Sequence, residues 1–499
     1  MMTRLLQWKW EILAPVFGVM MTSAFAPYDY PYALIIALLG FFSFCLVTSR
    51  YRALWRGYLF GLGLFGTGIW WVYVSIHDFG GGDSISSTLL TMLLVMLWSL
   101  FPALTAFLIS PVLWMTGVWL RILAIPLIWV AVEYFRGYWL LNGFPWLQIA
   151  YSQLDTPLSG YAALIGVYGI GFLLAASAMV LFEIWRKKLS LHHGLIFGVL
   201  IWGGGVVLQN VEWTEVLGQP IKVTLVQGNI DQAYKWQTDQ MLSTLKLYQQ
   251  LTEQHLDSDV IIWPETAIPA FLEQVKSTYL EPLAKIVQEH GVDLVVSLPS
   301  SGEGNSYYNS VISLANMDVR YHKNHLLPFG EYLPLQPLSG WVLDQLQIPL
   351  GDFAAGDDMQ PLLKAGGYAF VTTICYEDAF AELVNRQVEY AAFLVNLTND
   401  AWFGDTAEPH QHMQIARMRA IETGRYLLRA TNTGLTGFVA PNGKIIKQAP
   451  LFTTTTLTDT ITPMQGLTPY AKLGDRWVFV GMLGLVLAAY GLIKLKSKF

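Results

Sequence analysis

Cys375, Glu265 and Lys323 are the residues of this chain whose types and surroundings point most directly to chemistry. Cys375 closes the apolar run 370–374, and Glu265 follows the run 260–264. A thiol that acts as a nucleophile needs a base to remove its proton, and a positive group or amide donors to hold the oxyanion of a tetrahedral intermediate. Glutamate, cysteine and lysine supply these three functions, so the set is suited to covalent catalysis.

Each of the three residues also has an ordinary structural interpretation. Free cysteines are among the most buried residue types, so Cys375 could be a small hydrophobe at the end of a core strand. A disulfide with Cys45, the only other cysteine, is disfavoured because Cys45 lies in an apolar segment. Glu265 could be a surface acid, and Lys323 a solvated lysine. Taken singly these alternatives are favoured, whereas the combination favours a catalytic set.

The acidity of the Cys375 thiol depends on its neighbours. A helix beginning at Asp378 would bring backbone amides close to the sulfur, and these amides together with Lys323 would lower the thiol pKa. Glu377 would raise it. The sequence leaves the balance between these effects open.

The polar segment from about 215 to 470 alternates short runs rich in Val and Ile with amphipathic stretches. The runs predict strands at 221–227, 260–263, 294–298, 310–314, 369–375 and 393–397. The stretches predict helices at 241–255, 278–290, 379–385 and 410–422. This alternation predicts an α/β sandwich, with a late hairpin turn at 441–444. Glu265 and Cys375 then fall at carboxyl ends of strands, where functional groups gather in open α/β sheets.

The composition predicts an integral membrane protein. Hydrophobic residues make up 54% of the chain and charged residues only 13%, against about 25% charged in soluble proteins. The net charge of -6, with no basic patch among aromatic residues, argues against a nucleic-acid partner. The chain is therefore expected to act in or at a lipid bilayer.

Apolar stretches long enough to cross a bilayer predict about eight transmembrane helices. They lie at 10–26, 31–49, 57–76, 87–110, 118–135, 159–184, 194–210 and 477–495. Basic residues fall on one side, which predicts cytoplasmic termini and an extracytoplasmic polar domain. We therefore expect a membrane domain at 1–212 with about seven helices, a catalytic domain at 213–472, and a last helix with a basic tail at 473–499. An alternative for the first stretch is a signal peptide cleaved after 24–26.

Two other features do not predict a metal or phosphate site. His410 and His412 have a spacing that metal sites can use, but the sequence shows no matching Cys or acid cluster beside them. The glycines at 80–82 lack the Lys-Ser/Thr that follows in a P-loop. We expect no metal and no cofactor.

Four motifs resemble the signature blocks of the nitrilase superfamily. They are Trp263–Thr266 (WPET), Lys323–Tyr332 (KNHLLPFGEY), Ile374–Glu377 (ICYE) and Asn399–Gly404 (NDAWFG). More closely, the full length, with its spans before and after the polar domain, resembles the apolipoprotein N-acyltransferases. The resemblance implies a nitrilase-like α-β-β-α sandwich inserted in a bundle of about eight transmembrane helices.

The resemblance also implies a reaction and the residues that carry it. Cys375 would take an acyl chain from a phospholipid, with phosphatidylethanolamine as the expected donor, and pass it to the N-terminal amine of a diacylglyceryl-apolipoprotein. Glu265 would be the general base and later proton donor, and Lys323 would stabilise the oxyanion. The residues expected to support the site or bind substrate are Glu331, Tyr376, Glu377, Trp236, Trp146, Asn309 and Trp402.

Membrane lipid is the expected environment of both substrates. The expected location is the bacterial inner membrane, with the catalytic domain on the periplasmic side and the chain monomeric. Residues 144–146 and an apolar loop around Trp341 and Leu343 are predicted to line the lipid approach, although such loops also serve as membrane anchors.

Two other classes of protein remain open from the sequence. One is a membrane-tethered amidase or nitrilase, in which the same Glu, Lys and Cys would hydrolyse C–N bonds with water as acceptor. The other is a transporter or receptor with an extracytoplasmic binding domain, which predicts ionisable residues in the middle of spans. Few such residues occur here.

Overall fold

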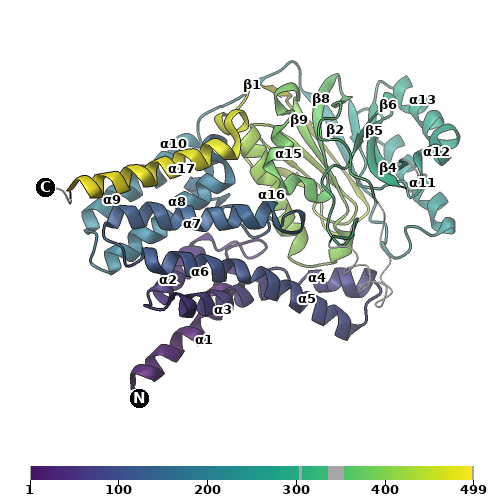
Figure 1. The fold of residues 1–499 in the computed structure, drawn as a ribbon. Coiled ribbons are helices and arrows are strands. Elements are labelled where there is room, and N and C mark those ends of the chain that lie inside the picture. Colours follow the sequence, from purple (N-terminus) through teal and green to yellow (C-terminus); the bar gives the residue numbers. More distant parts are fainter. Residues whose placement is uncertain (1, 303–305, 335–352, 497–499) are drawn as a thin grey trace. The chain divides into compact units, whose positions relative to one another are not determined.

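The computed structural model describes residues 2–302, 306–334 and 353–496, and the chain divides into two compact units (Figure 1). The first unit consists of residues 1–73, 84–211 and 473–499. The second consists of residues 212–472 together with the short segment 74–83. The assignment of the two units to membrane and extracytoplasmic space stays a prediction.

The first unit is built from apolar helices. Their bounds are α1 Met2–Thr22, α2 Pro31–Cys45, α3 Arg50–Gly68, α5 Ser84–Trp98, α6 Leu100–Val112, α7 Val118–Tyr138, α8 Ala162–Trp185, α9 Leu191–Gly198, α10 Gly204–Leu208 and α17 Pro469–Lys496. The helical backbone holds its polar groups in internal hydrogen bonds, as a bilayer requires, and most of the side chains are apolar. Arg121 on α7 lies within this apolar setting but is paired with Glu183 on α8 at 2.7 Å.

The predicted number of about eight spans is not confirmed. Within the described residues, five stretches are long and apolar enough to cross a membrane, or six if the bent pair 50–68 and 72–79 is one span. One reason is that α2 has only 15 residues, fewer than the roughly 20 that a bilayer core needs. The helices α5 and α6, on either side of Ser99, together form one such stretch.

The second unit contains two six-stranded mixed sheets. The first has the order β13-β2-β3-β4-β5-β6 and the second β12-β11-β10-β9-β8-β7. Strands of the first sheet are β2 Ile221–Gln227, β3 Val260–Ile262, β4 Asp293–Ser301, β5 Tyr307–Ser313, β6 Asn316–His322 and β13 Thr455–Ile461. Strands of the second are β7 Leu363–Ala365, β8 Tyr368–Ile374, β9 Phe393–Thr398, β10 Leu427–Thr431, β11 Gly437–Val439 and β12 Ile445–Gln448. A short pair, β1 Glu215–Val216 and β14 Met464–Gln465, lies outside both sheets.

The two sheets face one another across a buried apolar core. Val260 and Ile262 of β3 share one hydrophobic cluster with Phe370 and Ile374 of β8. Ile261, which lies between Val260 and Ile262, belongs instead to a cluster on the outer face. This switch follows from the two-residue period of a strand, and a run of consecutive apolar residues is what a strand buried on both faces requires.

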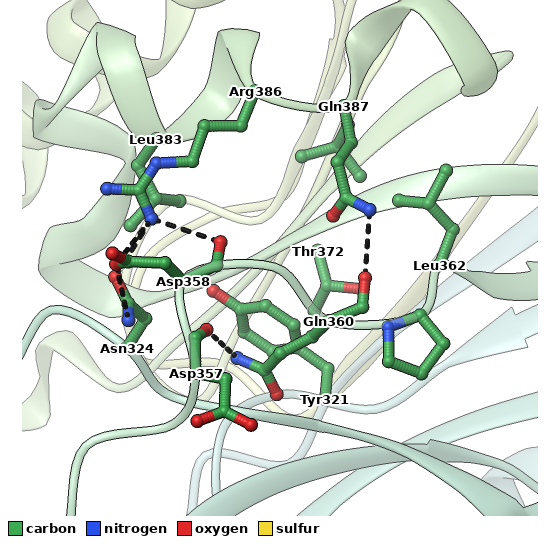
Figure 2. A pocket seen from close by; sticks show the side chains of 12 residues that line it. Tyr321, Asn324, Asp357, Asp358, Gln360, Leu362, Thr372, Leu383, Arg386 and Gln387 are labelled. Atoms are coloured by element: carbon green, nitrogen blue, oxygen red, sulfur yellow. Dashed lines mark hydrogen bonds and ion pairs between the residues drawn. The ribbon is translucent and has the colours of Figure 1, made fainter.

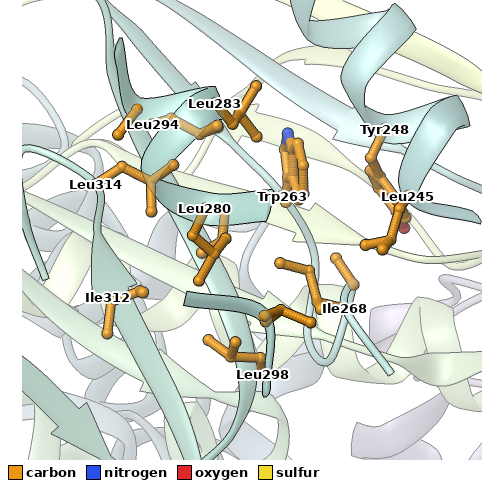
Figure 3. Close-up of a cluster of buried hydrophobic side chains, with 14 of the residues drawn as sticks. Leu245, Tyr248, Trp263, Ile268, Leu280, Leu283, Leu294, Leu298, Ile312 and Leu314 are labelled. Atoms are coloured by element: carbon orange, nitrogen blue, oxygen red, sulfur yellow. The ribbon is translucent and has the colours of Figure 1, made fainter. Parts of the chain in front are cut away.

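Helices cover the outer faces of both sheets. The helices α11 Thr238–Glu253, α12 Leu272–Val275 and α13 Glu281–Glu289 pack on the first sheet, where Trp263 lies between Tyr248 and the leucines of the cluster (Figure 3). The helices α15 Ala381–Asn385 and α16 Glu408–Thr423 pack on the second sheet. The expected α-β-β-α sandwich is therefore confirmed.

Most elements predicted in this unit are present with small shifts at their ends. The hairpin at 441–444 joins β11 and β12, and Gly443 there has φ +78°. The helix predicted from 278 begins at Glu281, because a π-helical turn occupies Lys276–Leu280. The sequence prediction lacks the strands β1, β6, β7, β10, β13 and β14.

Candidate active site

The three residues singled out from the sequence follow the ends of three strands. Glu265 comes after β3, Lys323 directly after β6, and Cys375 directly after β8. In the first sheet β4 is parallel to β3, and β6 is parallel to β4 because each is antiparallel to β5. The carboxyl ends of β3 and β6 therefore lie at one edge of that sheet. The end of β8 in the second sheet lies beside them, because Glu377 accepts hydrogen bonds from Ile374 N at the end of β8 and from Asn324 N just after Lys323.

Cys375 occupies a strained turn. Its φ is +51°, a left-handed conformation that costs energy for a residue with a Cβ. It begins the 3-10 helix η7, Cys375–Ala379, and its carbonyl accepts a hydrogen bond from Asn396 Nδ2 at 3.2 Å. The side chain is partly exposed. The left-handed turn places Cys375 directly after the end of β8.

Glu265 is a buried carboxyl group held by an amide. Asn309 on β5 donates from Nδ2 to Glu265 Oε1 at 2.8 Å, and the glutamate is 8% exposed. Burial raises the pKa of Glu265 above its ordinary value, although the positive charge of Lys323 opposes this rise. A carboxyl group with a raised pKa exchanges protons more readily near neutral pH, as a general base must.

Lys323 is buried and paired with an acid of its own loop. Its Nζ donates to Glu331 Oε1 at 2.8 Å, and Leu327 N donates to Glu331 Oε2 at 2.8 Å. Burial alone would lower the pKa of Lys323, but the carboxylates of Glu331 and Glu265 raise it above its ordinary range. The ammonium is therefore charged at neutral pH and held in one place.

The Cys375 thiol is protonated at neutral pH. Burial and the charge of Glu265 raise its pKa to about 12, while Lys323 acts in the opposite direction. The sequence left this balance open, with the start of a helix at Asp378 as one lowering influence. That helix, α15, instead begins at Ala381 after the short turn η7. A thiol of this kind needs a base before it can attack a carbonyl.

Glu377 is a buried carboxyl group that links two segments by hydrogen bonds. One is the turn Cys375–Ala379, here called the nucleophile turn, and the other is the loop that begins at Lys323 after β6, here called the lysine loop. Glu377 Oε1 accepts from the backbone N–H groups of Asn324 and His325 at 2.7 and 3.0 Å. Its Oε2 accepts from Ile374 N at 2.7 Å and from Tyr321 Oη at 2.9 Å. Burial raises the pKa of Glu377 to about 7, although Lys323 and these donors oppose the rise. Glu377 therefore fixes the positions of Cys375 and Lys323 through the backbone.

Figure 2 shows a group of hydrogen bonds, here called the clasp, that Arg386 and Gln387 make beside the lysine loop. Arg386 Nη1 donates to Asp358 Oδ1 at 3.0 Å and to Asn324 Oδ1 at 3.3 Å, and Gln387 Nε2 donates to Gln360 O at 2.8 Å. These contacts enclose a cavity of about 20 Å³, which has room for about one water molecule. The clasp ties the stretch after Lys323 to the stretch before β7.

The predicted aromatic residues lie in different settings. Trp236 is 56% exposed in the segment between β2 and α11, and Trp402 is 39% exposed with its ring 5.8 Å from Phe79. Tyr376 is buried against Phe380, at a ring distance of 5.1 Å. Trp146 belongs to the first unit, where it is buried with its ring 5.5 Å from Trp71. Trp341 and Leu343 lie outside the described residues.

Sequence reasoning missed a buried ionic network behind Cys375. His412 on α16 contacts Asp378 Oδ1 at 2.9 Å and Asp400 Oδ1 at 3.1 Å. Arg429 on β10 donates to the second oxygens of the same two aspartates, at 3.2 and 3.1 Å. The two aspartates raise the pKa of His412 well above its ordinary value, against the effects of burial and Arg429. Four separate segments supply these side chains, and their contacts arise only when the chain is folded.

The expectation that no acids accompany His412 is wrong. Asp400, Glu408 and His412 each place a possible ligand atom within 4.8 Å of the others. The spacing of Glu408 and His412 on one helix was the available signal. Asp400 is already neutralised by Arg429, which helps to hold its pKa at about 2 against the effect of burial. The three groups therefore form part of a balanced charge network.

Known proteins are similar to this chain over nearly its whole length. A family model described as apolipoprotein N-acyltransferase N-terminal domain matches residues 17–180, and one described as carbon-nitrogen hydrolase matches 222–470. An apolipoprotein N-acyltransferase of Methylococcus capsulatus is 46% identical over 476 residues, covering 95% of this chain and 94% of that protein. One from Nitrosomonas europaea is 40% identical over 484 residues, covering 96% of each.

Solved structures resemble part of the chain. Saccharomyces cerevisiae Nit3, a member of branch 10 of the nitrilase superfamily, is 19% identical with a TM-score of 0.38, covering 50% of this chain and 92% of that one. An amidase from Nesterenkonia sp. is 18% identical with a TM-score of 0.37, covering 53% and 98%.

Proposed function

Because the chain belongs to the apolipoprotein N-acyltransferase family and is an enzyme of lipoprotein N-acylation, we propose a two-step reaction carried by Cys375. In the first step the thiol takes an acyl chain from a phospholipid and releases a lysophospholipid. In the second step the N-terminal amine of a diacylglyceryl-apolipoprotein takes the chain from the enzyme. A thioester preserves acyl-transfer potential, so one difficult exchange becomes two easier ones.

Glu265 moves the proton in both steps. In the first, it removes the Sγ proton as the sulfur attacks the ester carbonyl, and it gives this proton to the departing glyceryl oxygen as the C–O bond breaks. In the second, it removes a proton from the attacking amine and returns it to Sγ as the C–S bond breaks. The raised pKa of Glu265 and the protonated state of Cys375 support this assignment.

Lys323 stabilises the oxyanion of both tetrahedral intermediates. Its ammonium is buried and fixed by Glu331, so the positive charge needs little rearrangement when negative charge develops on the carbonyl oxygen. Asn309 orients Glu265, and Glu377 with Tyr376 holds the nucleophile turn. We assign Trp236, Trp402 and Trp146 to substrate contact.

The observation that carries this proposal is the convergence of a protonated thiol, a buried carboxyl group and a fixed ammonium at strand ends of two sheets. The chain is a multi-pass protein of the inner membrane. We propose that residues 213–472 form a periplasmic catalytic domain, that 1–212 and 473–499 form the membrane domain, and that both termini are cytoplasmic. We further propose phosphatidylethanolamine as donor and a monomeric enzyme.

Product identity tests the reaction. The purified chain, incubated with phosphatidylethanolamine labelled in its acyl chains and with a diacylated lipopeptide, should give labelled triacylated peptide and lysophospholipid in equal amounts. Omission of the lipopeptide should stop turnover after the first step. Release of free fatty acid alone would contradict the proposal and favour a membrane-tethered hydrolase of the amidase type.

A further inference from the structure

Lys235 is a buried cation that the proposed reaction does not use. It lies between β2 and α11, and the residue is 2% exposed. Its Nζ donates to the main-chain oxygen of Glu265 at 3.4 Å, which is its only hydrogen bond to the part of the chain that the structure describes. An ammonium group has three donors, and buried polar groups are nearly always satisfied. Lys235 therefore keeps donor capacity for a ligand.

The two buried lysines beside Glu265 differ in their charge compensation. Lys323 has a carboxylate partner in Glu331, at 2.8 Å. Lys235 contacts a neutral carbonyl, and Glu265 acts on it only through the longer-range attraction of its charge. Burial lowers the pKa of Lys235 to about 8, and the attraction of Glu265 opposes this fall. At neutral pH the group is mostly charged, and a buried charge without a close partner favours the binding of an anion.

The segment that carries Lys235 is fixed to the second sheet. Asn432, beyond β10, accepts from Asn229 N through its carbonyl at 2.9 Å and from Ile230 N through Oδ1 at 2.8 Å. Gln232 accepts from Asn399 Nδ2 at 2.7 Å. The buried lysine is thus held near the carboxyl ends of strands in both sheets.

The neighbours of Lys235 in sequence suit a lipid interface. Tyr234 is 54% exposed and Trp236 is 56% exposed, so two amphipathic rings flank one buried ammonium. Such rings are favoured where one side is apolar and the other polar. A lipid head group presents an anion at the same boundary.

We propose that Lys235 binds the phosphodiester of the phospholipid donor while its ester carbonyl lies at Cys375. This inference rests on the proposed function and adds a head-group contact to it. The phosphodiester of a phospholipid lies only a few bonds from the ester that reacts. The positive side chain that binds the phosphodiester should therefore lie close to the base, Glu265, and be distinct from Lys323, which stabilises the oxyanion. Lys235 satisfies this condition because its contact is with the backbone of Glu265.

The test compares two acyl donors in the variants Lys235→Met and Lys235→Arg. One donor is phosphatidylethanolamine, and the other is a neutral p-nitrophenyl ester of the same fatty acid. The measurement is the rate at which an acyl group appears on Cys375, by intact-protein mass spectrometry. Lys235→Met should slow labelling by the phospholipid by about 10-fold or more, the range expected for loss of a hydrogen bond to a charged group. Its labelling by the neutral ester should persist, and Lys235→Arg should restore part of the phospholipid rate.

A matched control is Lys246→Met, because Lys246 is an exposed lysine on α11. It should react with both donors as the unaltered chain does. Equal slowing of both donors in Lys235→Met would overturn the inference and make Lys235 a counter-ion of Glu265. An unchanged phospholipid rate would also overturn it. Failure of the unaltered chain to form any thioester would instead contradict the proposed function.

Free phosphate provides a last discrimination. Inorganic phosphate, compared with chloride at equal ionic strength, should leave the phospholipid rate of the unaltered chain unchanged. Competition by inorganic phosphate that disappears in Lys235→Met would overturn the assignment to a lipid head group.

Discussion

The hydrogen bond from Asn309 to Glu265 allows the role of the base to be tested quantitatively. The variant Asn309→Leu has nearly the same shape but lacks the Nδ2 donor that lies 2.8 Å from Glu265 Oε1. Because this bond stabilises the ionised carboxylate, its loss should raise the pKa of Glu265 further. The Oδ1 atom of Asn309 has no partner among the described residues, so the substitution leaves no new donor or acceptor unsatisfied on that side.

The magnitude follows from the energy of a hydrogen bond to a charged group. Such a bond contributes about 1.5–3 kcal/mol. Its loss should reduce the acid dissociation constant of Glu265 by about 10- to 150-fold, since 1.36 kcal/mol corresponds to one pKa unit. If the carboxylate of Glu265 is the base, the acid limb of the pH–rate profile must move to higher pH by about 1 to 2 pH units.

The assay is the rate of thioester formation on Cys375 as a function of pH, from about pH 5 to about pH 9, where a base of this kind would titrate. Asn309→Leu should lose activity most strongly at acidic pH and recover toward the unaltered rate at alkaline pH. An acid limb that does not move, including a loss of rate that is uniform at every pH, would refute the assignment of Glu265 as the base.

Three further substitutions test the surroundings of the site. Glu377→Gln should lower the free energy of unfolding by about 1–3 kcal/mol, because it disturbs buried hydrogen bonds to the lysine loop and to Ile374. Urea unfolding measures this change. An unchanged stability would show that Glu377 does not hold the two segments together. His412→Gln should cost about 3–5 kcal/mol by breaking a buried ion pair. The folded pKa of His412 is raised, so its contribution is fully present below the unfolded value of about 6.5 and falls as pH rises toward the folded pKa. Thermal unfolding across pH should therefore show a penalty for His412→Gln that shrinks at alkaline pH; a penalty that grows would contradict this reasoning. Arg386→Ala should cost no more than about 1 kcal/mol, because its partner Asp358 is exposed, and a larger loss would show that the clasp stabilises more than its ion pair.

The sequence predicted those parts of the fold that local patterns encode. Strands such as β2 and β9 are runs of β-branched and other apolar residues buried on both faces, so their composition identifies them. The strand β13 is rich in threonine and lies at a sheet edge, which leaves it with no clear apolar pattern. The hairpin at Gly443 was predictable because its turn residues suit a positive φ.

The site was predictable where a residue follows a strand and belongs to a motif, as Cys375 and Glu265 do. Lys235 was not, because a lysine in a loop is usually solvated and only tertiary packing buries it. His412 was taken as a structural residue without acids beside it, because Asp378 and Asp400 reach it only after the second sheet forms. The expected number of about eight spans is not confirmed, because an apolar stretch in the sequence does not reveal that a helix such as α2 is short.

The central claim is that Cys375 carries the acyl chain as a thioester, and exposure of the purified chain to phospholipid alone tests it most directly. Intact-protein mass spectrometry should show one added acyl mass that maps to Cys375, disappears with hydroxylamine, and does not form in Cys375→Ser. Production of triacylated peptide by a chain that never acquires this mass, or the same adduct in Cys375→Ser, would contradict the account.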